Sequence, residues 1–384
     1  NLGSTIIARA VEQRPFDRFY KPSGDYYVGG TDELSRHNAA QLVGESTSYV
    51  DNYRFLGSLY ANIKFHKKVN LKVSYNTDAA YTLDYIYYNS NHPYCEDNGR
   101  IIEKNRFLMT NLIEGVLNYN DKYLDDNIEF AAMLGASYQK TNMRNNSIDA
   151  QNFPSPSYST VGSAAVFSGA TGGINEYAIA SYFGRASLSY KDKYVLNATL
   201  RTDGSSRFAP DCRWGIFPSV SLGWNISKEN FWTLSGYDLK FRASYGKTGN
   251  QDGISNYAWQ ALISSGANYD GVSGIAASTN GNNRLTWETA NQYDFGFDFN
   301  LLGGKVNFIF DTYLKDTENL LYQMPTPSTT GFTSILSNIG CMRNWGIELT
   351  IDAHLNLGPV LWNTSLNLTH NKNKLTRLLN DDII

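Results

Sequence analysis

Residues 200–226, LRTDGSSRFAPDCRWGIFPSVSLGWNI, contain two strand-like segments joined by a turn rich in glycine and serine. In the second segment, apolar and polar side chains alternate, with Val220, Leu222, Trp224 and Ile226 on one face and Ser219, Ser221, Gly223 and Asn225 on the other. Because successive side chains of a strand point to opposite faces, this stretch predicts a hairpin with one apolar and one polar side. The pattern recurs along most of the chain, with too few fully apolar runs to build a second layer. It therefore predicts a transmembrane β-barrel.

The composition favours one large β-domain for these 384 residues. The chain holds 27 Tyr, 19 Phe and 7 Trp, an aromatic share of 14%. Aromatic side chains suit strands, and they also form the girdles at the two membrane interfaces of a barrel. A soluble β-sandwich is rich in aromatic residues as well, so composition alone leaves that alternative open.

The charges, the apolar runs and the cysteines each exclude a class of protein. The formal net charge is -3 and the charged residues are dispersed, so we expect no nucleic-acid partner. The longest apolar runs fall well short of the ~18 residues that a membrane-spanning helix needs, which excludes a helical membrane protein. Cys95, Cys212 and Cys341 are odd in number and far apart, a pattern that predicts incidental thiols and no disulfide or zinc framework.

Alternating segments predict about twelve membrane crossings, at residues 55–65, 71–88, 107–123, 128–138, 180–190, 194–202, 218–226, 239–248, 293–301, 306–315, 345–355 and 361–370. Short turns alternate with long loops along the chain. The short turns include 66–70, 124–127, 191–193, 302–305 and 358–359, and the long loops are 89–105, 142–175, 203–213, 249–287 and 322–338. Short turns on one side and long loops on the other are typical of outer-membrane barrels. An open sheet would leave unpaired edges in hydrocarbon, so the barrel must close with further strands, within or outside this chain.

The alternation is clearest in the last four predicted strands. Their apolar face carries Phe295, Phe297, Phe299, Val306, Phe308, Phe310, Trp345, Ile347, Leu349, Ile351, Trp362, Leu366 and Leu368. We expect this face to contact lipid and the opposite face to contact water or a plug. Asn111 interrupts the apolar face of the segment 107–119.

Several blocks of sequence carry a family resemblance. They are LRTDGSSRF (200–208), RWGIFPSVSLGW (213–224), LKFRASYGKTGNQ (239–251), LTWET (285–289), YDFGFD (293–298), NIGCMRNWGIE (338–348), and Trp362 followed by NKNK (371–374). In this order they resemble the SusC/RagA family of TonB-dependent outer-membrane transporters. The resemblance covers residues 51–379.

That resemblance implies a barrel of roughly 22 strands with an N-terminal plug. Residues 1–50 match only loosely, as an earlier loop and strand region, and residues 51–384 resemble an interior part of the barrel. We find no plug domain and no TonB-contacting segment, so we expect the chain to be an interior portion of a longer protein. The resemblance further implies a Gram-negative outer membrane and import of oligosaccharides or peptides. The implied partners are membrane lipid, a SusD-like surface lipoprotein and, through regions outside this chain, the TonB complex.

No catalytic constellation is visible, so we expect neither an enzyme nor a bound cofactor or metal. The five His, at 37, 66, 92, 354 and 370, show no metal-binding spacing, and no Gly-x-Ser-x-Gly elbow is present. The segment 203–206 places serines beside an acid, but Gly and Asp there are typical of a turn. The glycine-rich segment 168–173 precedes a predicted strand instead of a helix, which makes it a poor phosphate site.

Two groups of residues are candidates for a functional site. Charged residues of the predicted inward face are Arg185, Arg201, Lys240, Arg242, Asp294, Asp298, Asp311, Glu348 and Asp352. We favour cross-strand and plug-facing ion pairs for them over direct solute contacts. The long loops carry Tyr257, Trp259, Tyr269 and Trp287, which either stack on sugar rings or grip a peptide, or anchor the barrel at the interface.

Two alternatives from other functional classes remain at this stage. A passive porin or adhesin barrel would lack a plug, so the full-length gene distinguishes it from an importer. A soluble β-rich binding module would not partition into detergent after membrane extraction.

Overall fold

The computed structural model describes residues 18–27, 38–93, 95 and 98–378, together with Ile7, Ala8, Ala10 and Val11. Several parts of the chain lie outside the described residues. They are much of the loosely matching region 1–50, including His37, part of the predicted loop 89–105, and residues 379–384. No helix among the described residues is both long and apolar enough to cross a membrane.

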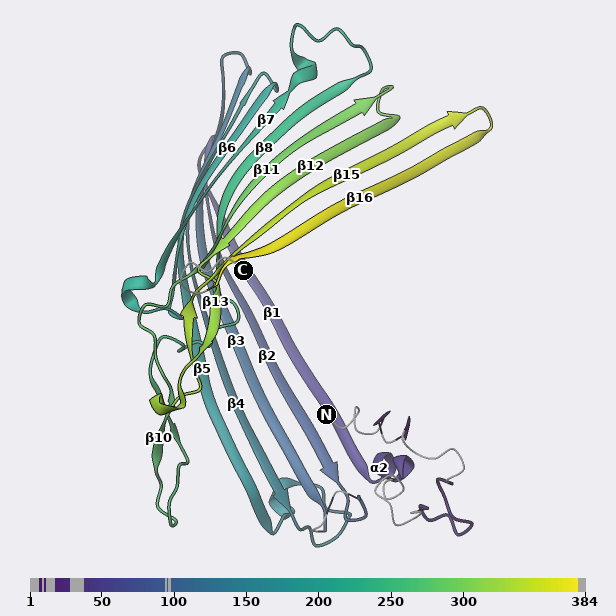
Figure 1. Ribbon diagram of the computed structural model, residues 1–384, viewed down its shortest axis with the longest axis vertical. Coiled ribbons are helices and arrows are strands. Elements are labelled where there is room, and N and C mark those ends of the chain that lie inside the picture. The colour runs from purple at the N-terminus through teal and green to yellow at the C-terminus, as the bar shows by residue number, and fades with distance from the viewer. Residues whose placement is uncertain are drawn as a thin grey trace. The chain divides into compact units, whose positions relative to one another are not determined.

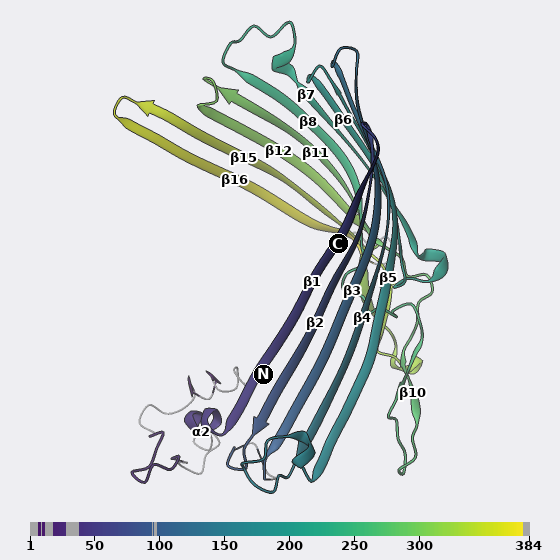
Figure 2. The ribbon, with the colours of Figure 1, turned by 180° about the vertical axis from the view of Figure 1, so that it is seen from behind.

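Twelve strands form one sheet in the order β1-β2-β3-β4-β5-β6-β7-β8-β11-β12-β15-β16, and neighbours lie side by side in both views (Figure 1 and Figure 2). Their bounds are β1 Ser46–His66, β2 Val69–Tyr88, β3 Arg100–Tyr123, β4 Ile128–Gln151, β5 Val166–Tyr190, β6 Tyr194–Ser205, β7 Trp214–Asn225, β8 Asp238–Asn250, β11 Glu288–Leu301, β12 Val306–Glu318, β15 Cys341–Leu357 and β16 Val360–Arg377. The predicted all-β antiparallel fold and its twelve main strands are confirmed.

The chain divides into two compact units. One comprises Asn1–Gly57, Thr77–Asn111 and Thr141–Glu176, and the other Ser58–Asn76, Leu112–Lys140 and Tyr177–Ile384. The first contains the helix α2 (Ala39–Gly44) and a buried cluster of Tyr87, Ile101, Ala150 and Phe153. The second contains all the short turns and the strands from β6 onward.

The short turns of the second unit all lie at the same end of the strands. Backbone hydrogen bonds join each turn to the next, from Lys191 to Asn127 (2.7 Å), from Asn225 to Lys193 (2.7 Å) and from Gly303 to Gly236 (2.8 Å). In the turn 302–305, Leu302, Gly303 and Gly304 all have positive φ, which glycine adopts without a steric penalty. The predicted turns at 124–127, 191–193, 302–305 and 358–359 are confirmed.

Several predicted loops are shorter than expected. The segment 142–175 contains the end of β4 and the beginning of β5, and β3 already begins at Arg100. β4 has 24 residues and β5 has 25, well beyond the roughly 9–11 residues of one crossing. Beyond the apolar stretch polar side chains predominate in these strands, so the regular alternation that marks a strand in sequence disappears while the backbone ladder continues.

The loops 249–287 and 322–338 also contain structure that the sequence did not predict. The first holds the hairpin of β9 (Leu262–Ser265) and β10 (Ile275–Thr279), and the second contains most of β13 (Leu321–Pro325) and all of β14 (Ser334–Asn338). These strands have only four or five residues each. Such short hairpins offer too little alternation to be recognised in a sequence.

The strand register separates the two faces of the sheet. One register row crosses eight strands through Tyr190, Tyr194, Trp224, Phe241, Phe297, Phe310, Leu349 and Leu368. Phe295 is 50% and Phe297 43% exposed, and Phe308 and Leu349 are half-buried. The apolar face of the sheet is therefore not packed into a protein interior, which excludes a sandwich core at these positions.

Candidate functional site

A buried aromatic cluster holds the long connections of the second unit together. Trp287 is 7% exposed, and its ring centroid lies 5.1 Å from that of Phe208 and 5.4 Å from that of Phe217. Its Nε1 donates a hydrogen bond to the carbonyl oxygen of Arg213 (2.9 Å). Ile254 and Leu285 complete the buried cluster, so one core joins the β6–β7 and β8–β11 connections to β7.

The Phe217 ring requires glycine beside it. A Cβ at Gly215 would lie 2.4 Å from the ring, and a Cβ at Gly249 would lie 2.2 Å from it. Both distances are far inside van der Waals contact, so only glycine lets the ring lie against the two neighbouring backbones. The glycines at these two positions therefore shape the base of the loops.

Amide side chains connect the same core to the β13–β14 hairpin. The Asn338 amide accepts a hydrogen bond from Thr286 N (2.8 Å) and donates one to Thr286 O (2.7 Å). Asn282 Nδ2 donates to the carbonyl oxygen of Leu336 (2.9 Å). The β6–β7, β8–β11 and β12–β15 connections are far apart in the sequence. They form one assembly at the strand ends opposite the short turns.

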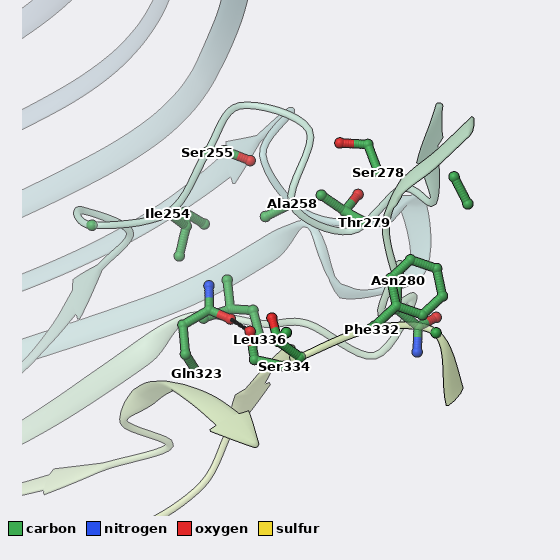
Figure 3. Close-up of a pocket in the computed structure, with 14 residues that line it drawn as sticks. Ile254, Ser255, Ala258, Ser278, Thr279, Asn280, Gln323, Phe332, Ser334 and Leu336 are labelled. Atoms are coloured by element: carbon green, nitrogen blue, oxygen red, sulfur yellow. Dashed lines mark hydrogen bonds between the residues drawn. The ribbon is translucent and has the colours of Figure 1, made fainter. Parts of the chain in front are cut away.

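This assembly encloses a cavity of about 340 Å³. Figure 3 shows it between the segment that carries Ile254, Ser255 and Ala258, the strand β10, and the β13–β14 hairpin. The residues that line it are Gly253, Ile254, Ser255, Ala258, Ala277, Ser278, Thr279, Asn280, Gln323, Gly331, Phe332, Thr333, Ser334 and Leu336. None of them carries an ionisable side chain.

The four loop aromatics that the sequence suggested are not among the lining residues. Tyr269 is 86% exposed at the tip of the β9–β10 hairpin, and Tyr257 is half-buried. Trp259 packs against the aromatic cluster. Trp287 differs most from the expectation of a ring free to stack, because Phe208 and Phe217 cover it. The aromatic residue of the cavity is Phe332, which no pattern in the sequence distinguished.

The predicted inward-facing charges lie on the sheet face opposite the phenylalanines, and several are paired. Arg242 Nη2 lies 2.7 Å from Asp298 Oδ1 and 3.0 Å from Asp311 Oδ1. Ser244 Oγ donates to Asp294 (2.9 Å). A second concavity of about 310 Å³ is bordered by Arg242, Ser244, Asp294, Asp311 and Lys240.

The remaining predicted charges fall into two groups. Arg201 Nε lies 2.8 Å from the Asp203 carboxylate, and Ser365 donates a hydrogen bond to Asp352 (2.6 Å). Arg185, Lys240 and Glu348 make no ion pair or side-chain hydrogen bond with any residue that the structure describes. A ladder of cross-strand pairs therefore accounts for part of the predicted set, and these three charges are available to a further partner.

The chain is similar to known receptors along nearly its whole length. A family model described as TonB dependent receptor-like, beta-barrel matches residues 6–382. A TonB-dependent receptor of Formosa agariphila is 36% identical over 274 residues, which cover 70% of this chain and 26% of the relative. The TonB-dependent receptor SusC of Bacteroides thetaiotaomicron is 36% identical over 220 residues, which cover 53% of this chain and 21% of the relative.

Among solved structures, the RagAB peptide transporter shares the fold, with a TM-score of 0.85 at 23% identity, over 93% of this chain and 40% of that one. The chain thus spans well under half the length of these relatives. The resemblance to SusC and RagA that the sequence blocks indicated is confirmed. The family model matches far more than half of the residues, so the chain belongs to the TonB-dependent receptor-like β-barrel family.

Proposed function

We propose that this chain forms part of the barrel of an outer-membrane, TonB-dependent importer of oligosaccharides or peptides that works with a SusD-like surface lipoprotein. The two-faced sheet is the observation that carries the proposal. Its apolar row, from Tyr190 to Leu368, consists of exposed and half-buried residues, while the face with Arg242 is charged. A sheet that is apolar outside and polar inside suits a barrel with lipid around it and water or a plug within.

The turns and loops set the orientation that we propose. In outer-membrane barrels short turns face the periplasm and longer loops face the outside. The strand ends joined by the turns 191–193 and 302–305 would then be periplasmic, and the assembly around Trp287 would face the medium. The cavity in that assembly would then lie on the side from which a solute arrives.

The inward charges would meet the plug. In the proposed barrel, Lys240, Arg185 and Glu348 face a lumen that the plug of the full-length protein fills. A buried charge needs a partner, and these three have none in the described part of this chain. We propose that they pair with charged side chains of the plug, whereas Arg242 is satisfied within the sheet.

The cargo classes are proposed from the relatives. SusC is named as a TonB-dependent receptor, and RagAB is described as a peptide transporter. The cell-envelope location, the energy source and the lipoprotein partner follow from the same resemblance and belong to the proposal.

A transport assay with the full-length receptor tests the proposed function. Cells that carry the receptor are given fluorescent oligosaccharides and fluorescent peptides, with and without a functional TonB. We expect accumulation of one cargo class that disappears when TonB is deleted. Uptake that continues without TonB would instead identify a passive porin, and a receptor that salt washes from the membrane would identify a soluble binding module.

A further inference from the structure

The cavity between the β8–β11 connection and the β13–β14 hairpin has a lining without charge. Its polar groups are hydroxyls, side-chain amides and backbone. A carboxylate or an ammonium group that entered it would lose water without gaining a counter-charge, which is costly. The chemistry of the cavity therefore disfavours charged peptide termini and acidic sugars.

Several of these polar groups are uncommitted. Within the part of the chain that the structure describes, the side chains of Ser255, Ser278, Asn280 and Thr333 make no hydrogen bond. Gln323 accepts a hydrogen bond from Ser334 at Oε1 (3.1 Å), which leaves its Nε2 donors free. Hydroxyls and amides both donate and accept, as the hydroxyls of a sugar do.

The apolar part of the lining gives the cavity a firm base. Ile254 is 7% exposed and belongs to the aromatic cluster, and Ala258 and Leu336 pack against that cluster. Phe332 adds a ring from the β13–β14 hairpin to the lining (Figure 3). The C–H face of a sugar ring packs against an aromatic ring such as that of Phe332, while its hydroxyls bind the polar groups of the lining.

The walls are held in place without a ligand. Asn282 and Asn338 bind the β13–β14 hairpin to the segment before β11 through hydrogen bonds of 2.7–2.9 Å. A site that is already ordered loses less conformational entropy on binding. The volume of about 340 Å³ lies at the small end of the range of about 300–1,000 Å³ for ligand sites.

We infer that this cavity is a binding site for an uncharged, hydroxyl-rich ligand, namely a short segment of a neutral oligosaccharide. The inference rests on the proposed import function and chooses the neutral carbohydrate among its cargo classes. Phe332 supplies the stacking surface, and Ser278, Asn280 and Thr333 bind hydroxyl groups.

Binding by the purified full-length receptor in detergent tests the inference. The receptor is applied to arrays of neutral glycans, acidic glycans and peptides, and the affinity of the best ligand is measured by titration calorimetry. We expect the best ligand to be a neutral glycan. Thr333→Val, which removes one hydroxyl and keeps the shape, is expected to weaken its binding about tenfold or slightly less.

Thr329→Val is the matched control. Thr329 is exposed on the same hairpin but does not line the cavity, so its substitution is expected to leave the affinity unchanged. Asn280→Asp places a charge in the cavity at almost constant volume and is expected to weaken the binding of a neutral glycan further. A circular dichroism spectrum that matches the unsubstituted receptor shows that each variant is folded.

The outcomes separate this inference from the proposed function. Three outcomes would overturn the neutral-glycan site: peptides or acidic glycans bind best, no array is bound, or Thr333→Val and Thr329→Val have equal affinity. TonB-dependent uptake can still stand in each case. Selective loss in Thr333→Val together with uptake that does not need TonB supports the site and rejects the active importer.

Discussion

Arg242 and Asp311 form an ion pair across an intervening strand, and Gly296 makes this possible. Arg242 lies on β8 and Asp311 on β12, and their register partner on β11 is Gly296. A Cβ at Gly296 would lie 2.2 Å from Asp311 Oδ1 and 2.9 Å from Arg242 Nη2. Tyr313 and Asn371 are related in the same way across Gly346, with a hydrogen bond of 2.9 Å. Glycine thus lets polar side chains connect strands that are not neighbours.

Gly296→Ala is expected to break the Arg242–Asp311 pair, because the new methyl group would occupy the path of the guanidinium group. Both crowded atoms are the ends of flexible side chains that can move aside, so the cost is the loss of one half-exposed ion-pair contact, about 0.5–1 kcal/mol. The temperature at which the receptor loses its heat-modifiable gel mobility should fall. Gly246→Ala is the control, since its Cβ would meet nothing closer than Ser219 Cβ at 3.6 Å. An equal effect of both substitutions would contradict the role of Gly296.

Phe297→Asp is expected to impair assembly far more than Asp298→Asn. Phe297 lies on the exposed apolar face, where a charge toward the bilayer midplane costs about 2–4 kcal/mol, somewhat less for Asp. Asp298 lies on the other face, and an amide there still accepts a hydrogen bond from Arg242. The fraction of folded receptor on unheated gels measures the difference, and equal losses would refute the assignment of faces.

Glu229 is expected to stabilise the β7–β8 connection except in strong acid. The Tyr194 hydroxyl, the Lys193 ammonium (2.9 Å) and Trp224 Nε1 (3.1 Å) bind its carboxylate and lower its pKa to about 2. Because the pKa is lower in the folded state than its ordinary value of 4.5, the stabilisation is complete above pH 4.5 and disappears as the pH falls through about 2.

Thermal unfolding of the receptor and of Glu229→Gln between pH 7 and pH 2 measures this contribution. The melting temperatures should differ by a constant amount above pH 5 and converge toward pH 2. A difference that persists unchanged at pH 2 would show that the ionised carboxylate is not its source.

Trp287→Ala is expected to loosen the long loops and leave the sheet intact. Removal of a buried Trp costs about 3–5 kcal/mol, and the lost contacts with Phe208 and Phe217 hold the connections together. Limited proteolysis of the folded receptor should therefore cut within 251–287 faster in this variant. Tyr269→Ala, at an 86% exposed position, should not change the rate.

The strands and their two faces could be predicted because side-chain alternation is a local property with a period of two. Phe297 and Asp298 are neighbours in the chain and lie on opposite faces, as the pattern required. The family could be predicted as well, because its sequence blocks fall in these strands and turns. The far ends of β4 and β5 were missed, because polar residues predominate there and leave no regular alternation to detect.

The partners on the polar face could not be predicted from that pattern. Asp298 stands opposite Lys240 in the strand register but pairs with Arg242. That diagonal pair depends on the register of β8 and β11. The further contact of Arg242 with Asp311 depends on the register of β12 and on the missing side chain at Gly296, so both pairings are non-local.

The loop site depended entirely on tertiary packing. Ser255 and Phe332 meet in one cavity because the core around Trp287 and the amide of Asn338 bring two distant connections together. The sequence of a loop does not show whether its aromatic side chain is buried by other segments or exposed to solvent. Burial of Trp287 was decided by Phe208 and Phe217, on other segments, which bury apolar surface when the loops assemble.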